Sequence, residues 1–304
     1  MRVEVDTTLG LLQAFKPLGR FMLRGPILAL VVSAATMYIP AQTQSPLSSA
    51  QNLSPNELVR RVVNHELAAD DQDHTHWMYR DITGVPAPCK EKTVIETKDG
   101  DLSRLDEIDN RPLTPEQKSA EVERIRNFVA DASAQRKARR ASEGDDSKST
   151  ELFSILPDAF TFQVAEEKGD TEKLSFHPNP GFHAHSMEAW VFHKMDGFVV
   201  INTRENRLVE ISGVLTNGVE FAGGLLGHLD PGGRFDVRLE EVAPNVWKIA
   251  RMKVNMHGKV LFFKTIGDQE DETRTEFKHI PDDMTLAQAE QMLLNQPGDR
   301  PAGQ

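Results

Sequence analysis

The clearest fold signal is the stretch FVVINTRENRLVEISGVL, residues 198–215. Two runs of strand-forming side chains, 198–202 and 208–215, flank a polar turn. From Val209 to Leu215, every second position is apolar or glycine, which is the period of a strand with one buried face. The stretch therefore predicts an antiparallel β-hairpin.

The chain around this hairpin repeats the same alternation. Further strand-like runs follow at 234–242, 246–256, 259–266 and 273–279. Within the second of these the apolar parity switches near Ala250, which predicts a β-bulge and hence a bend in the sheet. Counting similar runs in the first half of the chain, we expect about nine antiparallel strands.

Three segments have helix-start signals instead. Ser54-Pro55-Asn56-Glu57 precedes an apolar stripe, and Thr114-Pro115-Glu116 precedes another. Thr285 and Gln288 match a capping box for a last helix. We expect the second helix to end before Gly144, within a helical insertion at 114–149.

The order of elements indicates the fold class. Strands in consecutive hairpins with a few amphipathic helices predict an α+β fold rather than a doubly wound sheet. A large antiparallel sheet must curl, and the helices need an apolar surface to cover. We therefore expect one domain at 54–294, a curved antiparallel sheet in the form of an unclosed barrel wrapped over the helices.

The N-terminal region has the layout of a signal peptide. Residues 27–38 are twelve uncharged side chains after Lys16, Arg20 and Arg24, too few to span a bilayer. We expect a signal peptide at 1–41, with Met22 as an alternative start. The mature chain is then exported to the periplasm or the extracellular space, and it is soluble, without a transmembrane anchor.

Charge and cysteine content limit which partners and cross-links are expected. The formal net charge is −11, so nucleic acid is not expected to bind. The single cysteine, Cys89, can form no internal disulfide, and we interpret it as an inert thiol. Polar composition predicts a flexible leader at 42–53 and a disordered tail at 295–304. No sequence motif indicates a cofactor.

Two histidine pairs are weak candidates for a metal. His74 with His76, and His183 with His185, have the spacing that places two side chains on one face of a strand. Nothing fixes a third ligand, so surface histidines remain the simpler interpretation. No Gly-x-Ser-x-Gly motif exists, and no catalytic residue is proposed from the sequence.

Large apolar side chains are concentrated in the strand-rich half of the chain. Most must belong to an ordinary core. Some could instead line an apolar cavity between the sheet and the helices, for which we select Phe198, Val200, Trp247 and Phe262.

The hairpin from Asn202 to Ile211 resembles the outer-membrane lipoprotein carrier superfamily, the Lol-type and lipoprotein-sorting proteins. Residues 191–294 are also similar to exported bacterial proteins of unassigned function. The resemblance implies an unclosed antiparallel barrel with helices as a lid and a cavity for acyl chains. The insertion after Thr114 departs from the compact carriers.

Three functions remain open from the sequence. The first is a non-catalytic exported binder or carrier of a lipid, an acylated molecule or another apolar ligand. The second is an envelope interaction or structural module with a fully packed interior and a protein partner. The third is a metal-dependent enzyme that uses the histidine pairs.

Overall fold

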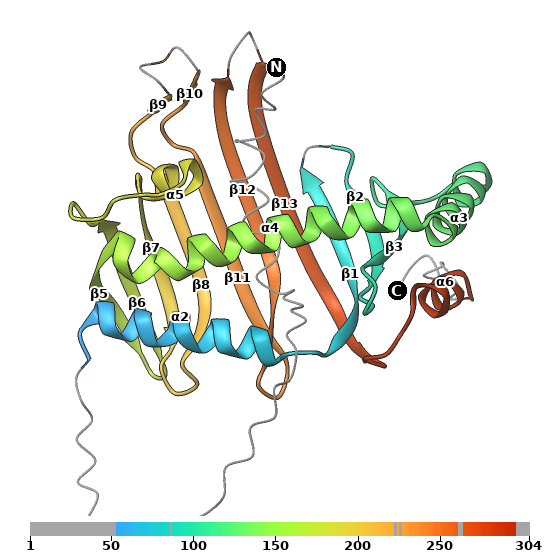
Figure 1. The fold of residues 1–304 in the computed structure, drawn as a ribbon, viewed down its shortest axis with the longest axis horizontal. Helices are drawn as coiled ribbons and strands as arrows, with labels where there is room; N and C mark the ends of the chain where they lie inside the picture. The colour runs from blue at the N-terminus through green and yellow to red at the C-terminus, as the bar shows by residue number, and fades with distance from the viewer. Residues whose placement is uncertain (1–52, 86, 222–223, 225–226, 261–263, 296–304) are drawn as a thin grey trace, which may run out of the picture.

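The computed structural model describes residues 53–85, 87–221, 224, 227–260 and 264–295. Figure 1 shows a broad sheet crossed on one face by two long helices. The expected signal peptide and residues 296–304 of the expected tail lie outside these ranges, as does most of the expected leader.

The described strands form one antiparallel sheet of 13 strands, more than the nine expected. Their order is β4-β3-β2-β1-β13-β12-β11-β8-β7-β6-β5, with β9 and β10 as a side branch on β12, so the sheet is not closed. Their bounds are β1 His76–Val85, β2 Lys90–Ile95, β3 Leu102–Ile108, β4 Arg111–Pro112, β5 Phe160–Lys168, β6 Thr171–Pro178, β7 Met195–Asn202, β8 Arg207–Leu215, β9 Val219–Phe221, β10 Gly227–Leu229, β11 Arg234–Ala243, β12 Val246–Val260 and β13 Lys264–Ile280.

Five helices are described beside this sheet, which confirms the expected α+β class. Figure 1 shows α2 and α4 across one face of the sheet and α3 and α6 together beyond β3. Their bounds are α2 Pro55–Gln72, α3 Pro115–Ala130, α4 Ala132–Ala159, α5 Met187–Phe192 and α6 Leu286–Asn295.

Helix starts follow the capping signals in the sequence. Ser54 and Thr114 are the N-caps of α2 and α3, each with a reciprocal capping box. Thr285 and Gln288 exchange the same bonds at the start of α6. These side chains satisfy backbone N–H groups that have no partner within the helix. All three predicted starts are therefore confirmed.

The predicted end of the second helix is wrong. The helical segment is interrupted at Asp131, whose carboxylate accepts bonds from the N–H groups of Ser133 and Ala134 and caps α4. Helix α4 then continues through Gly144 to Ala159, ten residues beyond the predicted insertion. A single glycine costs a helix only about 1 kcal/mol. Burial of side chains further along α4 outweighs that cost.

The predicted bulge in β12 is confirmed. Arg238 pairs with Arg251, but Leu239 pairs with Ile249, so Ala250 is the extra residue. The separate strand expected at 259–266 is wrong, because its two ends belong to β12 and β13. These strands are 15 and 17 residues long, and both continue past the positions where apolar alternation is clear.

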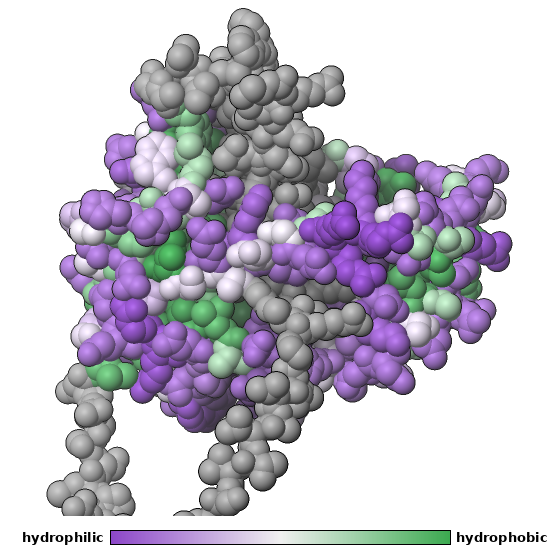
Figure 2. Space-filling model, viewed as in Figure 1, coloured by the Kyte–Doolittle hydropathy of each residue, from purple (hydrophilic) through white to green (hydrophobic). Residues whose placement is uncertain are grey.

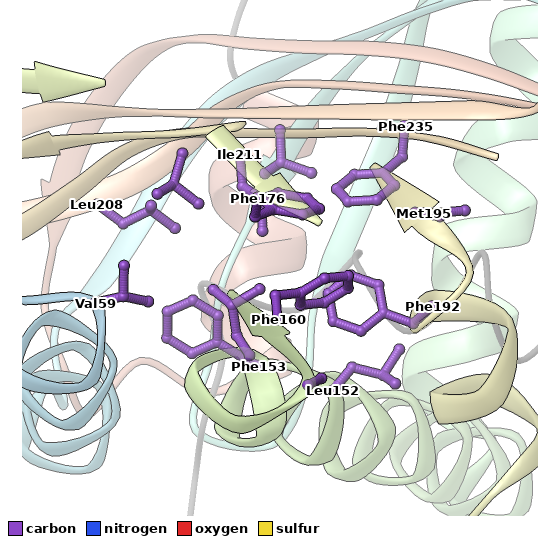
Figure 3. Packing of buried hydrophobic residues seen from close by; sticks show 14 of the residues in the cluster. Val59, Leu152, Phe153, Phe160, Phe176, Phe192, Met195, Leu208, Ile211 and Phe235 are labelled. Carbon is purple, nitrogen blue, oxygen red and sulfur yellow. The ribbon is translucent and has the colours of Figure 1, made fainter. Parts of the chain in front are cut away.

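The main core lies between the sheet and the helices α2, α4 and α5, as Figure 3 shows. Phe160 at the start of β5 is fully buried. Its ring centroid lies 4.5 Å from that of Phe176 and 5.1 Å from that of Phe192. From α4, Leu152 and Phe153 pack against the same cluster. This part of the interior is closely packed with aromatic and aliphatic side chains.

The same face of the sheet becomes charged toward β13 and β1. Met252 of β12 belongs to the core, and its cross-strand neighbour is Glu272 of β13. Arg274 donates to Glu272 over 2.6 Å and pairs in register with Asp81 of β1. The pKa of Asp81 is raised to about 6, mainly by burial and secondly by the charge of Glu272. The main core thus ends at β12.

A second core closes the other end of the sheet. Ile125 of α3 and Leu293 of α6 are fully buried against Ile95 of β2 and Leu102 of β3. At the edge of the sheet, the Glu121 carboxylate of α3 accepts a bond from the Leu105 N–H over 2.8 Å. Helix α3 therefore satisfies part of an edge that would otherwise be free to pair.

Candidate functional site

A pocket of about 280 Å³ lies where the second half of α2 meets α4 and the β11–β12 turn. This volume is near the lower limit of typical ligand sites. Its wall combines charged and apolar side chains from five elements and the turn between two of them. The lining residues are Glu66, Leu67, Ala69, Asp70, Gln72, Asp73, Thr150, Phe153, Arg207, Leu208, Leu239, Asn245, Val246, Trp247 and Lys248.

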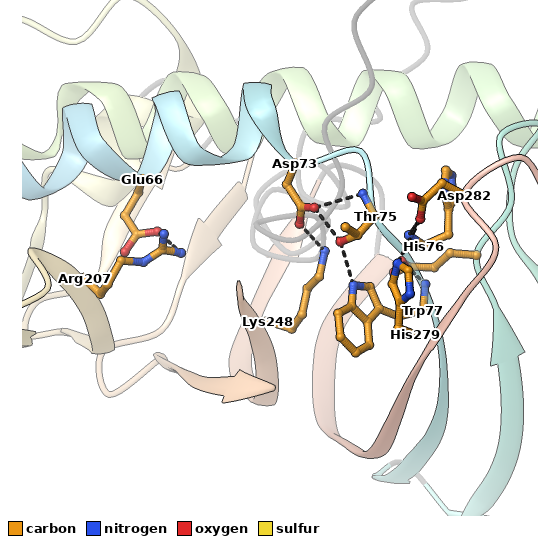
Figure 4. A network of polar contacts seen from close by, with 10 residues as sticks. Glu66, Asp73, Thr75, His76, Trp77, Arg207, Lys248, His279 and Asp282 are labelled. Atoms are coloured by element: carbon orange, nitrogen blue, oxygen red, sulfur yellow. Dashed lines mark hydrogen bonds and ion pairs between the residues drawn. The ribbon is translucent and has the colours of Figure 1, made fainter. Parts of the chain in front are cut away.

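The innermost charges of the pocket are a buried ion pair (Figure 4). Arg207 Nη2 of β8 lies 2.9 Å from Glu66 Oε2 of α2, and both side chains are about nine-tenths buried. Glu66 Oε1 also accepts a bond from the Leu208 N–H over 2.7 Å. Burial raises the pKa of Glu66 to about 7, although Arg207 and the Leu208 N–H oppose the shift.

A second ion pair lies at the end of α2 (Figure 4). Lys248 Nζ is 2.8 Å from Asp73 Oδ2, and the lysine side chain is buried. Asp73 Oδ1 accepts bonds from the N–H and hydroxyl of Thr75, whose hydroxyl accepts from Trp77 Nε1. Burial alone would raise the pKa of Asp73, but Lys248 and Thr75 together lower it. Asp73 is therefore held as a carboxylate.

Two N–H donors at the pocket have no acceptor. Arg207 Nε and Trp247 Nε1 are both shielded from solvent, and no described residue accepts a hydrogen bond from either. The Arg207 guanidinium lies 6.0 Å from the centre of the Trp247 ring. An unsatisfied buried donor costs about 1–3 kcal/mol, so such groups need an explanation. Among the buried polar side-chain groups of the pocket wall, these two donors are the ones without a hydrogen-bond partner in the described chain.

The apolar wall of the pocket comes from four elements. Leu67 of α2, Phe153 of α4, Leu208 of β8 and Leu239 of β11 all line it. All four pack within the main core or against it, so they are held rigidly. The pocket wall therefore combines apolar side chains with paired charges, and two buried donors without an acceptor lie behind it.

The predicted cavity residues fall in different places. Trp247 lines the pocket. Phe198 and Val200 lie on the opposite face of β7 from Val199, which is buried in the core, and Lys173 Nζ lies 3.7 Å from the Phe198 ring centre. These two side chains therefore do not reach the pocket. Phe262 lies outside the described residues.

The histidine pairs are not brought together. His76 is buried at the start of β1, and His74 is exposed just before it. His183 and His185 are exposed in the loop after β6. Five strands separate β1 from β6, roughly 29 Å at 4.8 Å per strand. In the described part of the chain, no three His, Cys, Asp or Glu side chains group as a metal site.

The sequence reasoning missed the charged residues of the pocket. Glu66 continues the apolar stripe of α2 that contains Val59, Val62 and Val63. A carboxylate on the buried face of an amphipathic helix must find a partner. The position of Glu66 in this stripe was therefore the signal in the sequence that pointed to a buried charge. Arg207 as the partner could not be inferred, because 141 positions separate the two residues in the chain.

Comparison with known proteins gives no relative: no protein-family model, no curated protein and no solved structure matches the chain. The resemblance to lipoprotein carriers therefore stays a prediction. Among the described helices, none is both long and apolar enough to cross a membrane.

The raised pKa of Glu66 gives a prediction about pH. Its pKa is about 7 in the folded protein, against an ordinary value of 4.5. The folded state therefore binds this proton more tightly, and the stability that it contributes is lost as the pH rises from about 4.5 to 7. Between pH 4.5 and 7, the free energy of unfolding of the wild type should fall by on the order of 3 kcal/mol relative to that of Glu66→Gln.

Urea unfolding of both proteins at several pH values measures this difference. The glutamine keeps an oxygen for the Leu208 N–H but has no proton to release. A difference that stays constant from pH 5 to pH 8 would show that Glu66 ionises as an ordinary carboxyl group.

Proposed function

We propose that the protein is a non-catalytic binder of a lipid-like ligand in the pocket between α2, α4 and the β11–β12 turn. The observation that carries the proposal is the pair of buried donors without an acceptor, Arg207 Nε and Trp247 Nε1. A bound acceptor would satisfy them and return the free energy that their burial costs.

The charges around the pocket favour an uncharged acceptor. Arg207 is already paired with Glu66, and Lys248 with Asp73. An added anion would compete with those two carboxylates. An ester or amide carbonyl, by contrast, accepts N–H bonds and brings no charge. The Leu67, Phe153 and Leu239 side chains then suit an acyl chain attached to it.

Contact with the donors requires a small movement of the wall. Both nitrogen atoms are shielded from solvent, but the Trp247 side chain is only half-buried and belongs to the strand next to the β11–β12 turn. In this proposal the ring turns as the carbonyl enters. The ring's contact with solvent is what permits that movement.

A packed interaction module is the second candidate. The tight aromatic cluster around Phe160 favours it, because closely packed rings fill this part of the main core. The pocket lies beside that cluster rather than within it. The two functions therefore differ in whether the pocket is ever occupied.

Export is part of the same proposal. It is supported by the uncharged run at 27–38 that follows basic residues. Fractionation of the host cell, with N-terminal sequencing of the protein recovered, tests it directly. A chain that retains residues 1–41 and stays in the cytoplasm would contradict it.

Native mass spectrometry of the protein purified from its own host tests occupancy first. A bound acyl species at fixed stoichiometry supports the binder. A bare mass from that source would favour the packed module. Bound zinc would instead favour a metal site that uses His74, His76, His183 or His185.

Calorimetric titration then tests the donors. Methyl laurate should bind more tightly than dodecane, because only the ester has a carbonyl. Trp247→Phe keeps an aromatic ring and removes the Nε1–H, so it should weaken ester binding about three- to tenfold. Binding of dodecane should not change.

Trp190→Phe is the matched control for this substitution. Trp190 is also half-buried, but it packs against Phe221 and does not line the pocket. Its replacement should leave ester binding unchanged. Equal losses in the two variants, or equal affinity of wild type for ester and hydrocarbon, would contradict the carbonyl proposal.

A further inference from the structure

The first half of α4 has four basic side chains within five residues. Arg136, Lys137, Arg139 and Arg140 are all exposed to solvent. Figure 2 shows strongly hydrophilic side chains gathered over this part of the helix. We call these four residues the basic face of α4.

The basic face points away from the sheet. At about 3.6 residues per turn, its four residues fall within one half of the helix circumference. Most of the buried residues of α4, including Leu152 and Leu156, fall on the opposite half. The packing of α4 therefore fixes the direction in which the basic face is presented.

None of the four cations forms an ion pair with a described carboxylate. Two acidic residues are nevertheless close: the charge of Asp131 at the start of α4 interacts with Arg136, and Glu143 follows on the same helix. The whole chain has a net charge of −11. On an acidic protein, this exposed basic face without a close ion pair is therefore available to an external anion.

We propose that the basic face of α4 docks the protein onto an anionic lipid surface. Each Lys or Arg near such a surface contributes about 1 kcal/mol. At physiological salt the screening length is about 8 Å, so acidic groups farther than this from the basic face oppose the contact only weakly.

The size of the basic face favours lipid over nucleic acid. Residues 136–140 span only about 6 Å along the helix axis. Tight binding to duplex DNA draws on about 6–10 phosphate contacts along a groove. A membrane presents mobile headgroups that can gather under a compact group of charges, and it need not touch the acidic remainder of the protein.

The same helix connects this surface with the pocket. Thr150 and Phe153 of α4 line the pocket about three turns after Arg140. Docking through α4 would bring the pocket near the lipid. The docking surface does not depend on the proposed ligand site, because the basic face shares no residue with the pocket.

Co-flotation with vesicles tests the proposal. The full chain is mixed with phosphatidylcholine vesicles, with or without about 30% phosphatidylglycerol, at several salt concentrations. The wild type should prefer the anionic vesicles and lose that preference between about 50 and 300 mM NaCl. Vesicle binding is measured without any pocket ligand, so it is independent of that proposal.

The test variant replaces all four residues of the basic face with glutamine, which preserves helix propensity. Each lost charge should weaken anionic vesicle binding about fivefold, so the four together should weaken it by at least a hundredfold. Residues 27–38 are present in every protein compared, so they do not contribute to the difference.

A second quadruple variant is the charge-matched control. It places glutamine at four exposed basic residues that are dispersed over the protein: Arg61, Lys168, Arg234 and Lys278. It has the same net charge, and its vesicle binding should fall far less. Circular dichroism verifies that both variants are folded.

Three results would overturn the proposal. They are equal binding of wild type to neutral and anionic vesicles, equal losses in the two quadruple variants, and binding to a DNA duplex as tight as to the anionic vesicles. The last result would identify a general polyanion site instead of a lipid surface.

Discussion

Replacing Arg207 with leucine should lower the free energy of unfolding by about 3–5 kcal/mol at pH 8. The substitution leaves the Glu66 carboxylate buried without the guanidinium 2.9 Å away. At pH 5 the loss should be smaller, because Glu66 has a pKa of about 7 in the folded protein and is already neutral there. Urea unfolding at both pH values measures the effect.

The double variant Glu66→Gln/Arg207→Leu is the control for this experiment. It removes both charges and keeps an acceptor for the Leu208 N–H. Replacing a whole buried pair is often neutral, so most of the loss should be recovered. If Arg207→Leu is equally destabilising at pH 5 and pH 8, its cost comes from lost packing rather than from the uncompensated carboxylate.

Phe160→Ala should destabilise the protein by about 3–5 kcal/mol. Phe160 is fully buried at the start of β5, where the end of α4 joins the sheet. Its ring packs against both Phe176 and Phe192, so truncation removes two aromatic contacts and leaves a cavity in the core. The midpoint of urea unfolding should fall with little change in slope.

Val164→Ala in the same strand is the matched control. Val164 is 47% exposed on the outer part of β5. Its truncation creates no cavity and should cost less than about 1 kcal/mol. Comparable losses at the two positions would mean that Phe160 does not anchor the core.

Local signals in the sequence account for much of the fold. The helix starts at Ser54, Thr114 and Thr285 were predictable because a capping box is completed by residues three positions apart. The bulge at Ala250 was predictable because apolar parity in a strand changes only when an extra residue is inserted. These features depend on interactions within a few residues of the chain.

The length of α4 shows where local reasoning failed. Asp145, Asp146 and Gly144 read as a helix end in isolation. The helix continues because Leu152 and Phe153 are buried in the core, and tertiary packing of that kind outweighs weak local propensity. Only the position of α4 against the sheet supplies that burial.

The pocket shows the same limit for function. The sequence suggested an apolar cavity as an alternative to ordinary core, and of the residues chosen for it Trp247 lines the pocket. Phe198 and Val200 were chosen on hydrophobicity, but a strand has two faces and the core occupies the other one. Which face is inside depends on which side the helices cover.

The sequence alone determined the α+β class, the antiparallel hairpins, the helix starts and the bulge, because each arises from neighbouring residues. Tertiary structure alone decided the pairing of Glu66 with Arg207 and the separation of the two histidine pairs. It also decided the outward direction of the basic face of α4. These depend on the order of strands in the sheet and on packing between segments more than a hundred residues apart, for which a single sequence has no local signal.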